Sequence, residues 1–304
     1  MWRSPPGGDK HVRRVGRFME VNVNELKVPT LLGEVAFQVE GPEHGVPIVL
    51  LPGLTLNSED WPKSLRRQLR SEGFRLYRMD LPDTGASERM KSDFSWSELT
   101  QAVESAITQA VPGPCHLVGL SLGGLLLQKM DLARLAPLSL TLLMTCASTY
   151  PVSFDGLKSL GKLLKVPLHH CEDRAFYESL AFREHLALRA SESELREIRD
   201  RVYRSVERGW PYERGPQRQM KLALEFFSGT RPDFSHWTFP TLIIHGGQDP
   251  LLPVWSSRAL HRQIPNSRFV VIEEMGHEFR ESLSQILLLE LLPHFQMDLA
   301  EVAV

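Results

Sequence analysis

The pentapeptide Gly119-Leu120-Ser121-Leu122-Gly123 places strong limits on what this chain can fold into. Apolar residues 115–118 precede it and residues 124–130 follow with helical character, which predicts a strand, a tight turn and a helix. The two glycines have a steric role, because a serine in a strained turn leaves no room for side chains two residues away. Such a turn lifts the hydroxyl clear of the sheet. We therefore interpret Ser121 as a candidate nucleophile.

Composition places the chain among ordinary soluble enzymes. Of its 304 residues, 42% are hydrophobic and 24% are charged, which suits one large α/β domain or two small domains. The formal net charge of -2 gives no sign of a polyanion-binding surface, so nucleic acid is not expected as a partner. Apolar runs such as residues 286–292 are too short to cross a bilayer, so no membrane span is expected.

The cysteines and the N-terminal residues bear on the cellular compartment. The 3 cysteines are an odd number without metal-ligand spacing, which favours a reducing, cytoplasmic environment. His169-His170-Cys171 suggests a metal at first sight, but no matching ligands recur at zinc spacing, so no metal is expected. Residues 1–17 are rich in Pro, Gly and Arg and lack the apolar stretch of a signal peptide, so we expect a mobile arm.

Apolar runs alternate with amphipathic stretches through much of the chain, a pattern typical of βαβ units in a parallel sheet. Residues 21–39 alternate in polarity around a turn near Gly33, which predicts an antiparallel hairpin. Buried strands are expected at residues 48–51, 74–79, 115–118, 138–145, 241–245 and 268–272. Helices are expected at residues 61–70, with Pro62 in the first turn, at 97–110, and from about 283.

Residues 148–236 break this alternation, because no convincing buried strand occurs among them. Helices are expected there at residues 157–164, 175–188 and 217–227. A further helix should open at Ser191-Glu192-Ser193-Glu194, a capping box, and continue to Val206. We therefore divide the chain into a core of residues 18–147 and 237–304 and a helical lid of residues 148–236.

Two more residues complete a candidate catalytic set with Ser121. A serine hydroxyl is a poor nucleophile at neutral pH, so it needs a base, and the base needs an orienting acid. Asp249 follows the expected strand at 241–245, and His277 follows the strand at 268–272. All three residues then lie at carboxyl ends of strands, where ligands gather in open α/β sheets. The chain order Ser, Asp, His predicts a triad of Ser121, Asp249 and His277.

Each of these residues also has a purely structural interpretation. A serine between glycines is often only a turn, an aspartate before proline is often a helix cap, and a histidine after glycine is often a loop residue. Their occurrence at three strand ends in the expected order favours catalysis. His245, inside its strand, is expected to be packed and hydrogen-bonded near the site. Residues 80–87 are interpreted as a braced turn beneath the site, without a chemical role.

The oxyanion formed when an ester is attacked needs two backbone donors. One should be the N–H of Leu122, the residue after the nucleophile. The other should come from the loop after the first parallel strand, residues 52–57, and we assign it to the N–H of Leu54. Gly53 allows the backbone to approach closely.

These motifs also carry a family resemblance. They are Trp61-Pro62, Asp83-Thr84-Gly85-Ala86-Ser87, the pentapeptide around Ser121, Pro240-Thr241-Leu242, Asp249-Pro250 and Gly276-His277. From about Pro47 to the C-terminal helix the chain resembles the α/β-hydrolase superfamily. The resemblance implies an α/β-hydrolase fold, with a mostly parallel central sheet, helices on both faces and a helical lid. Within the superfamily the motifs are similar to the aclacinomycin methylesterase group, which hydrolyses a methyl ester on a polyketide. One departure is Pro52-Gly53, where the family commonly has His-Gly.

The sequence thus predicts a carboxylic ester hydrolase that acts on a small-molecule ester through an acyl-enzyme, without a cofactor. C–C bond hydrolysis of ketones and cofactor-free perhydrolysis use the same triad and remain alternatives, as does a ligand-sensing pseudo-enzyme. Haloalkane and epoxide opening are disfavoured, because those enzymes have an aspartate where this chain has Ser121. Neither the substrate-binding residues nor the oligomeric state follow from the sequence.

Overall fold

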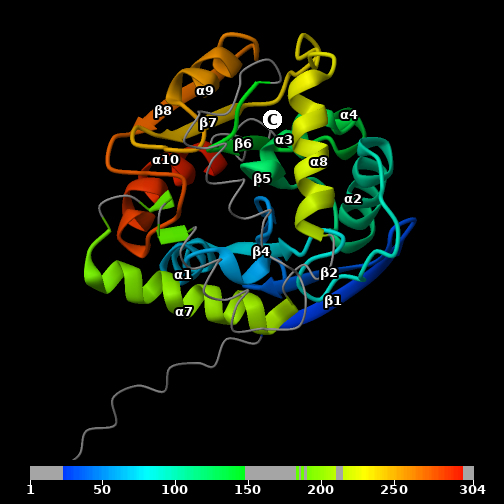
Figure 1. Cartoon of the computed structure of the whole chain (residues 1–304), viewed down its shortest axis with the longest axis horizontal. Helices are drawn as coiled ribbons and strands as arrows, with labels where there is room; N and C mark the ends of the chain where they lie inside the picture. The colour runs from blue at the N-terminus through cyan, green and yellow to red at the C-terminus, as the bar shows by residue number, and fades with distance from the viewer. Residues whose placement is uncertain (1–22, 148–182, 185, 188–189, 210–214, 297–304) are drawn as a thin grey trace, which may run out of the picture.

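The structure, a computed structural model, describes residues 23–147, 183–184, 186–187, 190–209 and 215–296. The predicted arm at residues 1–17, the predicted helix at 157–164, His169-His170-Cys171 and most of the predicted helix at 175–188 lie outside the described residues. The described part is built around an eight-stranded sheet with the order β1-β2-β4-β3-β5-β6-β7-β8 (Figure 1).

The first two strands form the predicted antiparallel hairpin at one edge of this sheet. β1 (Asn24–Thr30) pairs with β2 (Gly33–Glu40) in a register that sets Thr30 opposite Gly33. Gly33 has a φ of 78°, a left-handed conformation that glycine adopts without steric cost, so the chain reverses where the sequence has a glycine. β2 also pairs antiparallel with β4 (Phe74–Met79), which joins the hairpin to the rest of the sheet.

From β4 onward all strand pairs are parallel, as predicted. The strands are β3 (Val46–Leu51), β5 (His116–Leu120), β6 (Ser139–Leu143), β7 (Thr241–Gly246) and β8 (Ser267–Ile272). Successive side chains of a strand face opposite sides of the sheet and so build two apolar layers. Val49 and Leu142 pack in one layer, whereas Ile48 and Val118 pack in the other. Burial on both faces explains why these strands are continuous apolar runs.

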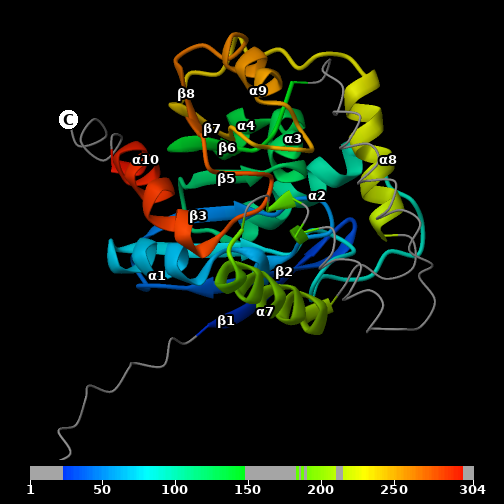
Figure 2. The same cartoon turned by 60° about the vertical axis from the view of Figure 1, so that its left-hand side comes forward.

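Helices cover both faces of the sheet, which confirms the predicted architecture (Figure 2). α1 (Lys63–Ser71) and α10 (Ser284–Gln296) contribute Leu65 and Leu287 to the layer that contains Ile48. α2 (Trp96–Ala110), α3 (Leu122–Lys129) and α9 (Val254–His261) contribute Leu99, Leu125 and Leu260 to the other layer. The remaining short elements are α4 (Leu132–Leu135) and two 3-10 turns, η1 (Ser58–Asp60) and η2 (Glu281–Leu283).

Some helices differ from the prediction, α1 and α9 among them. α1 begins at Lys63, so that Pro62 is its N-cap residue and does not belong to its first turn. The preceding residues are already used in η1, whose capping box joins Asn57 to Asp60. α9 was not predicted, because polar residues interrupt its eight-residue length and leave too few apolar positions to show a helical period.

Two long helices are inserted between β6 and β7. α7 (Glu192–Gly209) begins after Ser191, whose backbone N–H donates to Glu194 Oε2 at 2.7 Å, and it extends one turn past the predicted end. α8 (Gly215–Ser228) follows it. α7 lies beside η1. α8 lies beside α3 (Figures 1 and 2). We refer to α7, α8 and the described residues 183–184 and 186–187 as the insertion. None of the described helices is both long enough and apolar enough to cross a membrane.

Candidate active site

Ser121 occupies the sharp turn between β5 and α3. Its φ of 49° and ψ of -109° are strained for a residue with a side chain, and the N–H of Ser121 is held by Leu143 O at 2.8 Å. The flanking glycines allow this turn. A Cβ on Gly119 would lie 2.6 Å from Gly123 O, and a Cβ on Gly123 would lie 2.4 Å from Leu51 O. The sequence therefore folds here as expected, with the serine hydroxyl at the carboxyl edge of the sheet.

The other two predicted residues of the triad lie next to Ser121, although they are more than 120 residues away in sequence. His277, after β8, sets its Nε2 3.0 Å from Ser121 Oγ. Asp249, after β7, sets its Oδ2 2.5 Å from His277 Nδ1. The side chain of Asp249 is fully buried, and that of His277 is 5% exposed. This chain of hydrogen bonds is able to move a proton from the hydroxyl to the imidazole while the carboxylate stays ionised.

Asp249 is held by more groups than His277. Its Oδ1 accepts the backbone N–H groups of Leu251 and Leu252, both at 2.8 Å. Its Oδ2 also lies 3.3 Å from His245 Nε2. Burial alone raises the pKa of Asp249, but the charge of His277 and the hydrogen bonds of both histidines outweigh it and hold the pKa well below its usual value. The carboxylate is therefore ionised at neutral pH.

The two predicted oxyanion donors belong to residues close to the serine. Leu122 is the first residue of α3. Leu54 follows β3 and comes directly after Gly53, where an added Cβ would lie 3.4 Å from Ser121 Cβ. Neither the Leu54 nor the Leu122 backbone N–H has a hydrogen-bond partner among the described residues. Unpaired N–H groups at a helix start next to a nucleophile suit an anion that forms during reaction.

Two cavities meet at Ser121, and Leu54 and Leu251 line both of them. The first is also lined by His277 and by the more polar residues Thr55, Arg183 and Glu278. The second is almost wholly apolar and is also lined by Leu122, Leu125, Met220, Ala223 and Phe227. A substrate whose reacting carbon lies at Ser121 therefore extends to either side of it.

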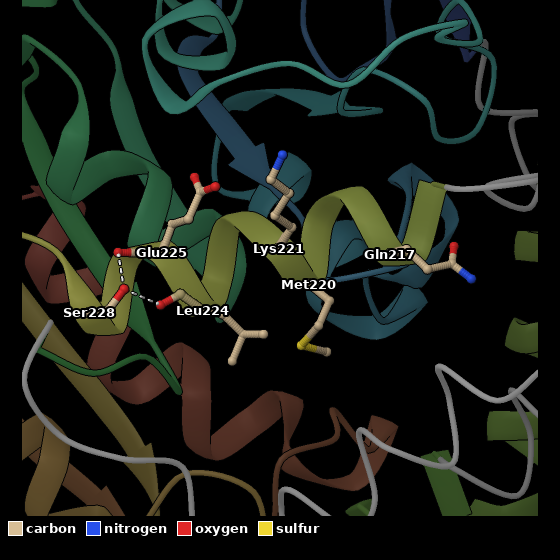
Figure 3. Close-up of a pocket in the computed structure, with 6 residues that line it drawn as sticks. All are labelled: Gln217, Met220, Lys221, Leu224, Glu225 and Ser228. Carbon is tan, nitrogen blue, oxygen red and sulfur yellow. Dashed lines mark hydrogen bonds between the residues drawn. The ribbon is translucent and has the colours of Figure 1, made fainter.

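One side of α8 closes the apolar cavity. Met220 and Leu224 line this cavity and also a groove along the helix that includes Lys221 and Glu225. Figure 3 shows Met220 and Leu224 projecting from one side of α8 and Lys221 and Glu225 from the other. The helix thus presents thioether and aliphatic groups to the cavity beside Ser121.

The insertion is hydrogen-bonded to both loops that carry the candidate site. The N–H of Thr55, next to Leu54, donates to Gln219 Oε1 of α8 at 2.7 Å. Thr55 has a φ of 64°, so this bond holds a strained residue. The N–H of His277 donates to Leu186 O at 2.9 Å. Both the oxyanion loop and the histidine loop therefore depend on residues outside the core of the sheet.

A buried cluster of charges lies beneath the histidine loop. Arg183 pairs with Asp60 and, through Nε at 2.8 Å and Nη2 at 2.5 Å, with both oxygens of Glu278. Arg201 of α7 reaches Glu278 Oε1 at 2.6 Å. Burial alone raises the pKa of Glu278, but the two guanidiniums lower it below its usual value. These charges compensate one another and fix the residue that follows His277.

The turn at residues 80–87 forms a second contact with the insertion. Arg208 Nε lies 2.8 Å from Asp80 Oδ2, and Arg218 Nη1 lies 2.7 Å from Asp83 Oδ2. Burial raises the pKa of Asp80, although the charge of Arg208 opposes this rise. The turn was interpreted from sequence as a brace beneath the site, and in the structure it also anchors α7 and α8.

Sequence reasoning missed Arg183, Leu186 and Gln219. Gln219 did leave a signal, because it stands three and seven residues before the buried Leu222 and Phe226 and so falls on the apolar face of its helix. A buried polar residue on such a face needs a partner. Leu186 acts through its backbone oxygen, which leaves no trace in the sequence. Among the described residues no cluster of His, Cys, Asp and Glu is suited to a metal ion.

Comparison with known proteins places this site in a family. The sequence pattern of the Alpha/beta hydrolase family matches residues 48–284. The chain belongs to the alpha/beta hydrolase family. The match runs from within β3 through η2, and so it includes Ser121, Asp249, His277 and the insertion. The resemblance predicted from the motifs is thereby confirmed.

Two of the relatives that the chain matches are esterases by name. The chain is 27% identical over 257 residues to rhodomycin D methylesterase DauP of Streptomyces sp. (strain C5), which covers 76% of this chain and 84% of the relative. It is 30% identical over 248 residues to the pimeloyl-[acyl-carrier protein] methyl ester esterase of Aeromonas salmonicida (strain A449), with coverage of 80% and 92%. Among solved structures, esterase RhEst1 from Rhodococcus sp. ECU1013 superposes with a TM-score of 0.72 at 18% identity, covering 90% of this chain and 98% of that one. This structural likeness shows the fold alone.

Proposed function

We propose that this alpha/beta hydrolase is a carboxylic ester hydrolase in which Ser121, His277 and Asp249 act as the catalytic triad. The proposal rests on one observation above all, the hydrogen-bonded chain from Ser121 Oγ to His277 Nε2 at 3.0 Å and from His277 Nδ1 to Asp249 Oδ2 at 2.5 Å. A serine in that position has a base to take its proton, and the base has an acid to fix its tautomer.

The reaction proceeds in two halves. His277 takes the proton of Ser121 as the hydroxyl attacks the ester carbonyl, and the N–H groups of Leu54 and Leu122 bind the oxyanion. The intermediate collapses when His277 returns the proton to the departing alcohol, which leaves an acyl group on Ser121. His277 then takes a proton from water as the hydroxide attacks the acyl carbonyl. The bond between Ser121 Oγ and the acyl carbon breaks, His277 returns the proton to Ser121 Oγ, and the acid is released. Asp249 stays ionised throughout and stabilises the imidazolium, so no cofactor is needed.

The two cavities support an assignment of the two halves of the ester. His277 protonates the leaving alcohol, so the alcohol lies in the cavity that His277 lines. The acyl group lies in the apolar cavity under Met220 and Phe227, which makes α8 part of a lid over the acyl group. Both relatives described above are named for the hydrolysis of methyl esters. We therefore propose a methyl or other short alkyl ester of an apolar acid as the small-molecule substrate.

A cytoplasmic location also belongs to the proposal. Cys115 and Cys146 are buried and free, as thiols are in a reducing compartment. Fractionation of the native host with an antibody against the chain tests this location, and recovery in the secreted fraction would contradict it.

Covalent labelling provides the decisive experiment. A fluorophosphonate should label the wild-type protein, and Ser121→Ala should lose both the label and the turnover of p-nitrophenyl acetate by several orders of magnitude. Ser139→Ala is a matched control, because Ser139 Oγ also lies 2.8 Å from a histidine nitrogen, that of His116. The control should label like the wild type. Persistent labelling of Ser121→Ala would refute the assignment of the nucleophile.

A substrate panel separates the proposed reaction from its alternatives. Steady turnover of methyl and p-nitrophenyl esters supports an esterase, whereas a binding signal without turnover supports a ligand sensor. Faster cleavage of vinylogous diketones than of esters would indicate a C–C bond hydrolase. Peracid formation from acetate and hydrogen peroxide would indicate a perhydrolase.

A further inference from the structure

The carboxylate of Asp249 faces two histidines. Its Oδ2 lies 2.5 Å from His277 Nδ1 and 3.3 Å from His245 Nε2. His245 is the fifth residue of β7 and is fully buried, so its ring is fixed within the sheet. The role given above to Asp249 needs only one of these histidines. The second has no part in the reaction as written.

The partners of His245 assign the proton on its Nε2. This nitrogen lies 2.9 Å from Leu252 O and 3.3 Å from the ionised Asp249, and both of these oxygens are only able to accept. Nε2 must therefore carry a hydrogen, since a bare nitrogen there would face two lone pairs. At the other side of the ring, Nδ1 lies 2.6 Å from Ser257 Oγ, which also contacts the backbone oxygen of Thr145. Ser257 thus fixes the ring from behind.

We infer that His245 is a positioning residue of the triad, a second N–H donor that holds Oδ2 of Asp249 in line with His277 and withdraws part of its negative charge. The inference rests on the proposed function, because it assigns His245 a role through Asp249. It requires no contact between His245 and the substrate.

The other groups around Asp249 do not take the role that we infer for His245. The two backbone donors, Leu251 and Leu252, both bind Oδ1, so neither donates a hydrogen bond to Oδ2. The thiol of Cys146, three residues after the end of β6, also interacts with Asp249, and burial raises the pKa of this thiol so that it stays neutral. The lowered pKa of Asp249 has both histidines among its causes. The orientation and the charge of Oδ2 are thus shared between His277 and His245.

Removal of the His245 N–H should lower the rate of the chemical step more than it weakens substrate binding. In His245→Leu the Asp249 carboxylate loses a hydrogen bond made to a charged group, and kcat should fall roughly ten- to hundredfold with little change in KM. Without the N–H of His245, the full negative charge of Asp249 acts on His277 and stabilises its protonated form more strongly. The acidic limb of kcat/KM should consequently move to higher pH, a change that a loss of packing alone does not produce.

A pair of polar variants makes the test independent of packing. His245→Gln keeps an N–H donor near the position of Nε2, so it should recover kcat to within severalfold of the wild type and keep its acidic limb. His245→Asn has a shorter amide, which reaches toward Ser257 but not Asp249, and it should behave like His245→Leu. His261→Gln is the remote control, because His261 Nδ1 makes a similar bond of 2.8 Å to Ser267 Oγ away from the site. This control should match the wild type.

The outcomes separate the inference from the proposed function. Wild-type labelling by the fluorophosphonate, with its loss in Ser121→Ala, establishes the triad before any His245 variant is measured. With that in place, equal kcat values and equal pH profiles for the Gln and Asn variants would overturn the role of His245. A folded His245→Leu protein with wild-type kcat and an unshifted acidic limb would overturn it as well. Failure of wild-type labelling would instead refute the proposed function.

Discussion

The side-chain oxygen of Gln219 on α8 accepts a 2.7 Å hydrogen bond from the backbone N–H of Thr55. Gln219 is separated from Thr55 by 164 residues and is 2% exposed. Thr55 follows Leu54, the proposed oxyanion donor, and has a φ of 64°. A contact of this kind ties the position of a donor loop to the insertion, so the insertion contributes to the site as well as covering it.

Loss of the Gln219 oxygen should therefore impair catalysis. Gln219→Met keeps the length of the side chain but leaves the N–H of Thr55 buried without an acceptor, which costs about 1–3 kcal/mol. We expect kcat for p-nitrophenyl acetate to fall roughly tenfold while KM changes little, because the oxyanion exists only after attack. Gln219→Glu retains an acceptor and should lose less. Equal kcat values for the Met and Glu variants would show that this hydrogen bond does not support the oxyanion loop.

The charge cluster around Arg183 should matter for stability. Arg183→Met leaves Asp60 and much of Glu278 without their partner in a buried place, and breaking a buried pair costs about 3–5 kcal/mol of unfolding free energy. Arg134→Met is the matched control, since its pair with Asp131 has side chains 78% and 55% exposed and should cost less than about 1 kcal/mol. Urea unfolding at neutral pH measures both. Similar losses for the two variants would contradict a structural role for the cluster.

Two buried histidines, His116 at the start of β5 and His294 in α10, should make the stability of the fold sensitive to acid. Burial lowers the pKa of His294 to about 4 and that of His116 to about 3. The unfolded chain has histidines near pKa ~6.5, so between these values it binds more protons than the folded chain. The unfolding free energy is therefore fully present above about pH 6.5 and falls as pH decreases toward the folded pKa values.

A single substitution tests this acid sensitivity. His294→Gln keeps a donor for Leu140 O, which His294 Nε2 contacts at 3.1 Å, but it does not titrate. Relative to pH 8, the variant should lose about 2 kcal/mol less unfolding free energy at pH 5 than the wild type does. His44→Gln, at an exposed position, should follow the wild-type curve. If the His294 variant and the wild type lose stability in parallel, the buried histidine does not titrate as inferred.

The fold was largely predictable because its signals are local. The glycines at 119 and 123 prescribe the turn at Ser121, and apolar runs such as residues 74–79 mark strands that are buried on both faces. The chain order of Ser121, Asp249 and His277 was also sufficient to predict that they meet, since strand ends share one edge. Their catalytic roles stay predictions until Ser121 is labelled.

The contacts of the insertion were not predictable in the same way. Arg183 and Glu278 are 95 residues apart, and nothing in either neighbourhood selects the other. The backbone oxygen of Leu186, which binds the N–H of His277, has no residue-specific signal at all. His245 lies four residues before Asp249, which marked it as a neighbour of the site, but the direction of its Nε2 depends on where Leu252 and Ser257 fold back.

The last prediction concerns the acyl group. If Met220 closes the acyl cavity, then Met220→Phe should fill it and lower kcat/KM for a hexanoate ester by roughly tenfold relative to the acetate ester. Met220→Ala should raise that ratio, because the cavity becomes longer. Met220 is 4% exposed and belongs to the apolar layer that contains Leu142, so Met220→Ala should also lower Tm, but it should change the substrate ranking in addition.

Substitutions within the sheet supply the contrast. Leu142→Ala removes a fully buried side chain from β6 and should cost about 2–5 kcal/mol of unfolding free energy while the ranking of esters stays the same. Measuring kcat/KM for acetate, butyrate and hexanoate esters beside Tm separates the two effects. A hexanoate-to-acetate ratio that is the same in the wild type and in both Met220 variants would place the acyl group elsewhere. The cavity lined by His277 would then be the one to mutate, because it is the other space that opens onto Ser121.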